Sequence, residues 1–159
     1  MSVNVRPATP ADASLIHQFI RDLAEYEKLL DAVEASEADT AAALFGDNPR
    51  AFADIAEIDG QPVGFALWFY NYSTFVGRHG IYLEDLFVRP AARGSGAGKA
   101  LLANLAKRCV VEGLGRLEWS VLDWNAPSIA FYDSLDAAAM NEWITRRLTG
   151  DALKKLAGV

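Results

Sequence analysis

The most chemically distinctive stretch of the chain is a glycine-rich turn, Arg93-Gly94-Ser95-Gly96-Ala97-Gly98-Lys99. It follows an expected strand and opens an expected helix. The first backbone N–H groups of a helix have no partner within the helix, and the helix dipole adds partial positive charge there. Glycine lets the backbone approach an anion closely, and Arg93 and Lys99 add full charges. The turn predicts a phosphate or pyrophosphate site, although a glycine-rich connection can also be no more than a tight turn.

The spacing of this turn argues against two common phosphate ligands. A P-loop has a glycine five residues before its last glycine and a hydroxyl after its lysine. Here Arg93 and Ala100 stand at those positions, which disfavours a Mg-nucleotide kinase or NTPase. The dinucleotide fingerprint needs a wider glycine spacing and more than one β-α-β unit. Neither is present around the turn.

The elements that position the turn alternate between periods of about 3.6 and 2. Thr9 and Pro10 are typical of a helix start, and Asp59-Gly60 is typical of a hairpin turn. We expect an α/β (α+β) chain with one mixed, mostly antiparallel sheet flanked by helices, as a single domain over residues 1–159. The expected strands are 3–6, 51–58, 61–70, 81–88, 117–122 and 143–148, and the expected helices are 10–28, 36–44, 99–112, 127–133 and 150–157, with a loop at 71–80.

Composition excludes several classes of protein. The chain has 159 residues, of which 52% are hydrophobic and 23% charged, so it can build a folded core. Its net charge of −6 disfavours nucleic acid as a partner. No apolar run is long enough to cross a membrane, and the first residues show no signal-peptide pattern. The single cysteine, Cys109, lies on the apolar face of an expected helix, where it would be a buried small hydrophobe. We expect a cytoplasmic protein without a disulfide or a metal site.

The turn and the strand before it resemble a known signature. Arg93-x-x-Gly96-x-Gly98 after Leu86-Phe87-Val88 resembles the coenzyme A motif of the GNAT N-acetyltransferases, and the element order is similar to that fold. Further stretches resemble the diamine (spermidine/spermine, thialysine) N-acetyltransferase branch, so that the resemblance covers nearly the whole chain. These stretches are residues 5–12, 22–27, 63–66, 82–88 and 124–132.

The resemblance implies a site for acetyl-CoA where two strands splay apart. Backbone groups of Leu86 and Val88 would pair with the pantetheine arm, and a backbone N–H near Phe87 would polarise the thioester carbonyl. Asn125 and Ser128 would lie near the pantetheine. The residues expected to hold the pyrophosphate are Arg93, Gly94, Ser95, Gly96, Ala97, Gly98 and Lys99.

The resemblance also implies an acid–base pair for acetyl transfer to an amine. An alkylammonium has a pKa of ~10.4 and must lose a proton before it attacks. Glu84 is the expected base, directly or through a water, and Tyr132 the expected donor to the departing thiolate. Strand alternation turns Asp85 to the face opposite Glu84 unless a bulge re-aims it. The expected substrate-binding residues are Tyr26, Glu27, Tyr82, Glu84 and Asp85.

Plainer interpretations of these residues remain open. Glu84 could be a solvated strand residue, Tyr132 a packing residue, and Tyr26 with Glu27 an ordinary helix end. The stretch Asp133-Ser134-Leu135-Asp136-Ala137 departs from the family pattern, and Glu142 is one acid where the polyamine enzymes carry an acidic run. The first departure argues against an extra phosphate contact in that stretch, and the second favours a smaller amine. Trp143 is expected in the core.

Three functions follow from this reading. The first is an acetyl-CoA-dependent N-acetyltransferase acting by direct attack of a small cationic primary amine such as a polyamine or thialysine. The second is a non-catalytic acyl-CoA-binding sensor or partner module on the same fold. The third is a nucleotide-phosphate binder, which Arg93 and Ala100 disfavour. The resemblance also implies a homodimer, with exposed Trp68, Phe69 and Tyr70 compatible with an interface.

Overall fold

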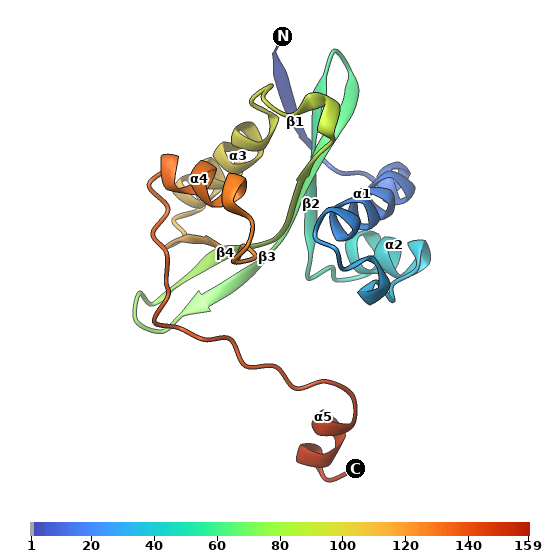
Figure 1. The fold of residues 1–159 in the computed structure, drawn as a ribbon, viewed down its shortest axis with the longest axis vertical. Coiled ribbons are helices and arrows are strands. Elements are labelled where there is room, and N and C mark those ends of the chain that lie inside the picture. The colour runs from blue at the N-terminus through green and yellow to red at the C-terminus, as the bar shows by residue number, and fades with distance from the viewer. Residues whose placement is uncertain (1) are drawn as a thin grey trace. The chain divides into compact units, whose positions relative to one another are not determined.

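The computed structural model describes residues 2–159, which form two compact units (Figure 1). The first unit ends at Leu122 and the second spans Asp123–Val159. The first unit holds a five-stranded sheet in the order β1-β2-β3-β4-β5. Neighbouring strands are antiparallel except for β4 and β5, which are parallel, so the expected mixed sheet is confirmed. The strands are β1 (Val3–Pro7), β2 (Phe52–Ile58), β3 (Gln61–Ser73), β4 (Arg78–Val88) and β5 (Leu117–Trp119).

Helices cover both faces of this sheet. In Figure 1, α1 and α2 lie on one side of the strands and α3 on the other. Short 3₁₀ turns precede and follow α1 and lead into the glycine turn. The helices of the first unit are α1 (Ala13–Tyr26), α2 (Glu37–Phe45) and α3 (Ala97–Glu112), and the 3₁₀ turns are η1 (Pro10–Asp12), η2 (Leu30–Ala32) and η3 (Pro90–Ala92).

Local residue choices explain where several elements start. Ser36 caps α2 because its hydroxyl accepts from the Asp39 backbone N–H at 3.1 Å, and the Asp39 carboxylate accepts from the Ser36 N–H in return. Asp59 and Gly60 both have positive φ, 51° and 74°, as the expected hairpin turn between β2 and β3 requires.

The core between the sheet and the helix pair α1–α2 is aromatic. Phe19 of α1 stacks on Phe65 of β3 with ring centroids 5.5 Å apart, and Phe87 of β4 packs against Phe19 at 5.9 Å. All three rings are buried. The alternation that places Phe65 and Phe87 on this face also decides which β4 residues face α1.

The other face holds a buried polar contact beneath α3. Trp68 of β3 donates its indole N–H to the buried Asp54 carboxylate of β2 at 2.9 Å. Arg108 of α3 lies over the Trp68 ring, 5.0 Å from its centroid. Burial raises the pKa of Asp54, while the Trp68 hydrogen bond and the charge of Arg108 oppose that shift. The expectation of an exposed Trp68 is therefore wrong, because alternation turns this ring inward under α3.

The structure corrects two further expectations. The loop expected at residues 71–80 is mostly a continuation of the β3–β4 hairpin, and only residues 74–77 form its turn. The strand expected at residues 143–148 is absent, and Trp143 is 72% exposed rather than in the core. The second unit instead contains α4 (Ala126–Ser134), an extended stretch and α5 (Gly150–Ala157).

Two phenylalanines test this account of the core. We expect Phe65→Ala to lower the free energy of unfolding by about 3–5 kcal/mol, because it removes a fully buried ring. Phe75→Ala is the matched control, since that ring at the hairpin turn is 96% exposed and its loss should be nearly neutral. Urea unfolding followed by fluorescence measures both. Equal destabilisation by the two variants would contradict the assigned core.

Candidate functional site

The central feature of the site is one extra residue in β4. Leu67 and Trp68 are consecutive on β3, yet their partners on β4 are Asp85 and Leu83. Glu84 is therefore an inserted residue, a β-bulge. The insertion resets the alternation, so that Asp85 shares the α1 face with Phe87 and Tyr82 instead of facing α3. From the sequence, Asp85 was expected on the face opposite Glu84 unless a bulge changed its direction. The structure has this bulge.

The bulge assembles three carboxylates with the end of α1. Glu27 follows the last residue of α1, and its pKa is raised by burial and by the charge of Glu84. Burial, then Glu84 and Glu27, raise the pKa of Asp85 to about 7. Like charges held together in partial burial cost free energy unless a cation joins them. The cluster of Glu27, Glu84 and Asp85, called the acidic cluster below, thus has the chemistry of an ammonium site.

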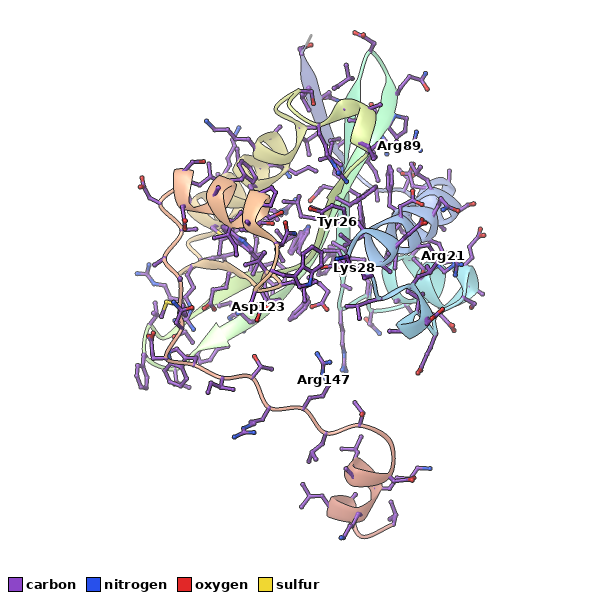
Figure 2. The ribbon with its side chains drawn as sticks, viewed as in Figure 1. Arg21, Tyr26, Lys28, Arg89, Asp123 and Arg147 are labelled. Carbon is purple, nitrogen blue, oxygen red and sulfur yellow. The ribbon has the colours of Figure 1, made fainter. Side chains whose placement is uncertain are left out.

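A cleft of about 340 Å³ lies at the same end of α1. Figure 2 places Tyr26 at the end of α1 that lies toward the sheet. The Arg93 guanidinium lies over the Tyr26 ring at 4.9 Å and over the Phe87 ring at 5.8 Å, and its Nε donates to the Val88 carbonyl at 3.2 Å. Arg93 therefore links α1 to the end of β4. The cleft is lined by Asp22, Glu25, Tyr26, Phe87, Pro90 and Arg93.

The glycine turn has the backbone shape that an anion site needs. Gly94 and Gly96 have φ of 80° and 89°, a region that other residues adopt only under strain. A Cβ at either glycine would meet no atom within 4 Å, so the backbone faces open space. Gly96 is the N-cap of α3, and Lys99 is exposed in its first turn. This geometry fits a pyrophosphate group held by backbone N–H groups and the helix dipole.

The strand beside the turn leaves room for an extended ligand. β5 pairs with β4 only at Ile81, Tyr82 and Leu83. β4 continues to Val88, with Leu86 and Val88 paired to β3 on their other side. One edge of this part of β4 therefore has no strand partner among residues 2–159, as expected for the splayed strands. Its backbone groups can pair with a ligand of amide character.

Tyr82 lies on the α1 face at the point where β4 and β5 separate. Its hydroxyl is hydrogen-bonded to the Ser120 hydroxyl at 2.6 Å, and its ring packs against Phe69 with centroids 5.3 Å apart. Sequence reasoning selected Tyr82 and missed Ser120, which follows β5. It also missed Asp22, Glu25 and Pro90, although the spacing of Asp22 and Tyr26, four residues apart on one helix, signals a shared face.

The remaining expected residues belong to the second unit. Asn125 is the N-cap of α4, and its side-chain oxygen accepts from the Ser128 backbone N–H at 3.3 Å. Tyr132 lies on α4, with its ring 5.5 Å from that of Phe131. The cap sets the start of α4 and thereby the positions of Ser128 and Tyr132 along it.

Neither a metal-binding cluster nor a membrane-spanning helix is present among the residues that the structure describes. Within residues 2–159, no cluster of three or more His, Cys, Asp or Glu side chains has the geometry of a metal site. In the same part of the chain, no helix combines the length and apolar character that crossing a bilayer requires. Cys109 is a buried free cysteine, as expected, and burial raises the pKa of its thiol.

Comparison with known families and proteins identifies the family and the fold. Residues 16–136 match the model of the acetyltransferase (GNAT) family. The thialysine N-epsilon-acetyltransferase of Sus scrofa is 39% identical over 99% of this chain and 98% of its own length. The L-ornithine N5-acetyltransferase NATA1 of Arabidopsis thaliana is 32% identical over 98% of this chain and 88% of its own length. A solved integron cassette protein from the mobile metagenome of V. cholerae superposes with a TM-score of 0.81 at 29% identity, covering 100% of this chain and 99% of that one.

The raised pKa of Asp85 predicts a cost to stability. The pKa of Asp85 is 3.8 in the unfolded chain and about 7 in the folded protein. At a pH between these two values, the folded state therefore binds one more proton than the unfolded state. Stability therefore falls as pH rises from about 4 to 7 and stays lower above it. We expect Asp85→Asn to raise the free energy of unfolding at pH 8 by about 1–3 kcal/mol and to have little effect at pH 3.

Urea unfolding at several pH values measures this effect. Asp59→Asn, in the exposed hairpin turn, is the matched control and should leave the pH dependence unchanged. A stability gain by Asp85→Asn that is the same at pH 3 and pH 8 would contradict the assigned cause.

Proposed function

The chain belongs to the GNAT acetyltransferase family, and we propose that it acetylates the terminal side-chain amine of a small, lysine-like amino acid such as thialysine or ornithine. It is an N-acetyltransferase, and its substrate is an amine of a small cationic molecule. The full-length similarity to enzymes named for thialysine and ornithine supports the proposed substrate class.

The observation that carries the proposal is the acidic cluster at the end of α1. Three carboxylates can carry more negative charge than one ammonium group neutralises. A substrate with a second positive charge therefore binds more favourably at the same cluster. An α-amino acid with a side-chain amine carries two ammonium groups within a short span. A long polyamine would need further acids. Glu142, the single acid before Trp143, does not supply such a run.

The acyl donor we propose is acetyl-CoA, the cosubstrate of the family. The turn at Gly94 and Gly96 fits its pyrophosphate, and the free edge of β4 up to Val88 fits its pantetheine amides. Acetyl-CoA supplies the activated acetyl group as a thioester. In this proposal Lys99 and the first turn of α3 hold the phosphates, while Asn125 and Ser128 serve the pantetheine.

The proposed transfer is a direct attack without an acyl-enzyme. Glu84 takes a proton from the substrate ammonium, directly or through a water. The amine nitrogen then forms a bond to the acetyl carbon as the C–S bond breaks, and the Tyr132 hydroxyl gives a proton to the departing sulfur. Tyr26, Glu27, Tyr82 and Asp85 orient the substrate. Cys109 is buried with a raised pKa, which disfavours it as a nucleophile.

Three broader features complete the proposal. We propose that residues 1–159 act as a single acetyltransferase domain, since the family match crosses the boundary at Leu122. A cytoplasmic location is consistent with one free cysteine. The proposed functional unit is a homodimer.

An assay of CoA-thiol release tests the substrate. We expect turnover of acetyl-CoA with thialysine, ornithine or lysine to exceed that with spermidine or putrescine by at least about tenfold in kcat/KM, or roughly 1.4 kcal/mol, because the chain is similar over its full length to enzymes named for thialysine and ornithine. Nα-acetyl derivatives of the same amino acids control for the second charge. Faster turnover of spermidine than of every amino acid would contradict the proposed class, and tight CoA binding without turnover of any amine would favour a non-catalytic sensor.

Two conservative variants test the assigned chemistry. Glu84→Gln and Tyr132→Phe should keep the affinity for CoA and lower kcat by about 10²–10⁴-fold, because each removes a proton-transfer group and little volume. Glu37→Gln and Tyr72→Phe are matched controls, since both side chains are exposed. CoA affinity by calorimetry and kcat by thiol release separate the two effects. Unchanged turnover in either test variant would remove that residue from the mechanism.

A further inference from the structure

The cleft at the end of α1 carries side chains of both charges. Asp22 and Glu25 of α1 line it together with Arg93, which follows η3. The two acids lie three residues apart in the helix and so share one face of it. Neighbouring charges of opposite sign favour a ligand that carries both signs itself, because each of its groups then finds a complementary partner. The cleft therefore has the chemistry of a site for a zwitterion.

The proposed substrate has one charged group that the acidic cluster does not attract. An α-amino acid with a side-chain amine carries two ammonium groups and one carboxylate. The cluster of Glu27, Glu84 and Asp85 attracts the ammonium groups but repels the carboxylate. A site that accepts such a molecule needs a cation for the carboxylate close to the cluster. Arg93 is the basic side chain among the described residues that line the cleft.

The Arg93 guanidinium is oriented by contacts that do not involve its terminal nitrogens. It lies over the rings of Tyr26 and Phe87, and its Nε donates to the Val88 carbonyl at 3.2 Å. None of the ion pairs within residues 2–159 includes Arg93. The ring contacts and the Nε hydrogen bond fix the plane of the guanidinium, and in this part of the chain they leave Nη1 and Nη2 for a ligand. Two coplanar donors of this kind match the two oxygens of a carboxylate.

The contacts of Arg93 also place it beside the acidic cluster. Tyr26 directly precedes Glu27, and Figure 2 shows Tyr26 at the end of α1 that lies toward the sheet. Phe87 lies on the α1 face of β4, two residues beyond Asp85. The guanidinium therefore contacts a neighbour of one cluster acid on α1 and a neighbour of another on β4. These contacts bring the cation and the acids within reach of one small molecule.

A phosphate of the acyl donor is the other anion that Arg93 can bind. The sequence pattern placed Arg93 with the pyrophosphate, and arginine pairs with phosphate as well as with carboxylate. Within the described chain, however, the contacts of its guanidinium are with α1 and β4 and not with the first turn of α3. That turn begins at Gly96 and offers its own backbone N–H groups and Lys99 to the phosphates. The contacts of Arg93 thus favour the substrate carboxylate.

We propose that Arg93 binds the α-carboxylate of the substrate, while Asp22 and Glu25 accept hydrogen bonds from its α-ammonium. The cleft recognises the amino-acid end of the molecule, and the acidic cluster holds the side-chain amine that is acetylated. This inference rests on the proposed function, since an α-amino acid carries both charges on one carbon. A diamine has no carboxylate, so its second cation meets an unpaired Arg93 in the cleft. Arg93 therefore selects amino acids over diamines.

Arg93→Gln tests the carboxylate contact on substrates that differ in this group alone. Putrescine is ornithine without its carboxylate, and bis(2-aminoethyl) sulfide is thialysine without its carboxylate. Measured by CoA-thiol release, kcat/KM for each amino acid should fall by about 10–100-fold, mainly through KM, because a charge-assisted contact is lost. The value for each diamine should stay the same or rise. Arg93→Lys, which keeps the charge but not the planar fork, should lose less.

Arg89→Gln is the matched control for this variant. Arg89 is also exposed and also lies over an aromatic ring, that of Phe19 at 5.1 Å, but it does not line the cleft. Its loss should leave the ratio of amino-acid to diamine turnover unchanged. In Arg93→Gln the KM for acetyl-CoA should stay close to the wild-type value. A rise in that KM equal to the rise for the amino acid would assign Arg93 to the phosphates and overturn the proposal, as would an equal loss of diamine turnover.

The two acids of α1 are tested with a substrate that lacks the α-ammonium. 5-Aminopentanoate is ornithine without this group. The double variant Asp22→Asn/Glu25→Gln should therefore lower kcat/KM for ornithine by about tenfold or more and leave that for 5-aminopentanoate nearly unchanged. Circular dichroism confirms that the variants are folded. Equal losses for the two substrates would remove these acids from the site.

The wild-type rates separate this inference from the proposed function. A wild type that turns over putrescine faster than ornithine and thialysine would contradict the proposed substrate class, and the inference with it. A wild type that prefers the amino acids, together with an Arg93→Gln variant that lowers all rates alike, would contradict the inference alone.

Discussion

One extra residue in β4 is the constraint on which the site depends. The bulge at Glu84 turns Asp85 onto the face of the sheet that carries Phe87, and there both acids meet Glu27 at the end of α1. This arrangement costs stability, because partly buried carboxylates repel one another. In the proposed function, a cationic substrate that binds there offsets this cost. The site is thus destabilised in the empty protein by the same charges that would select its ligand.

The aromatic core makes this arrangement possible. Phe87 lies two residues beyond Asp85. Its ring packs against the Phe19 ring and also contacts the Arg93 guanidinium. Packing of Phe87 therefore holds both the register of β4 and the position of α1 against it. On the other face, the contact of Trp68 with Asp54 and Arg108 holds α3, whose first turn follows the glycine turn. In the proposed function, opposite faces of one sheet therefore position the amine side and the phosphate side of the site.

The two units of the chain differ in how their apolar residues are satisfied. In the first unit, alternation in the strands places most large apolar side chains against helices. In the second, α4 begins at a well-formed cap, Asn125, but the chain beyond it exposes Trp143 and the leucines of α5.

The sequence by itself determined the features whose causes are local. The caps at Ser36 and Asn125, the hairpin at Asp59-Gly60 and the glycine turn all follow from neighbouring residues, and the structure has each of them. Hydrophobic alternation likewise predicted the mixed sheet. The tertiary structure alone decided which way Asp85 faces, because a one-residue bulge leaves no trace in periodicity and depends on pairing with β3. It also decided that Trp68 is buried and that residues 143–148 form no strand. A strand exists only through its neighbour, and no local pattern states whether that neighbour is available.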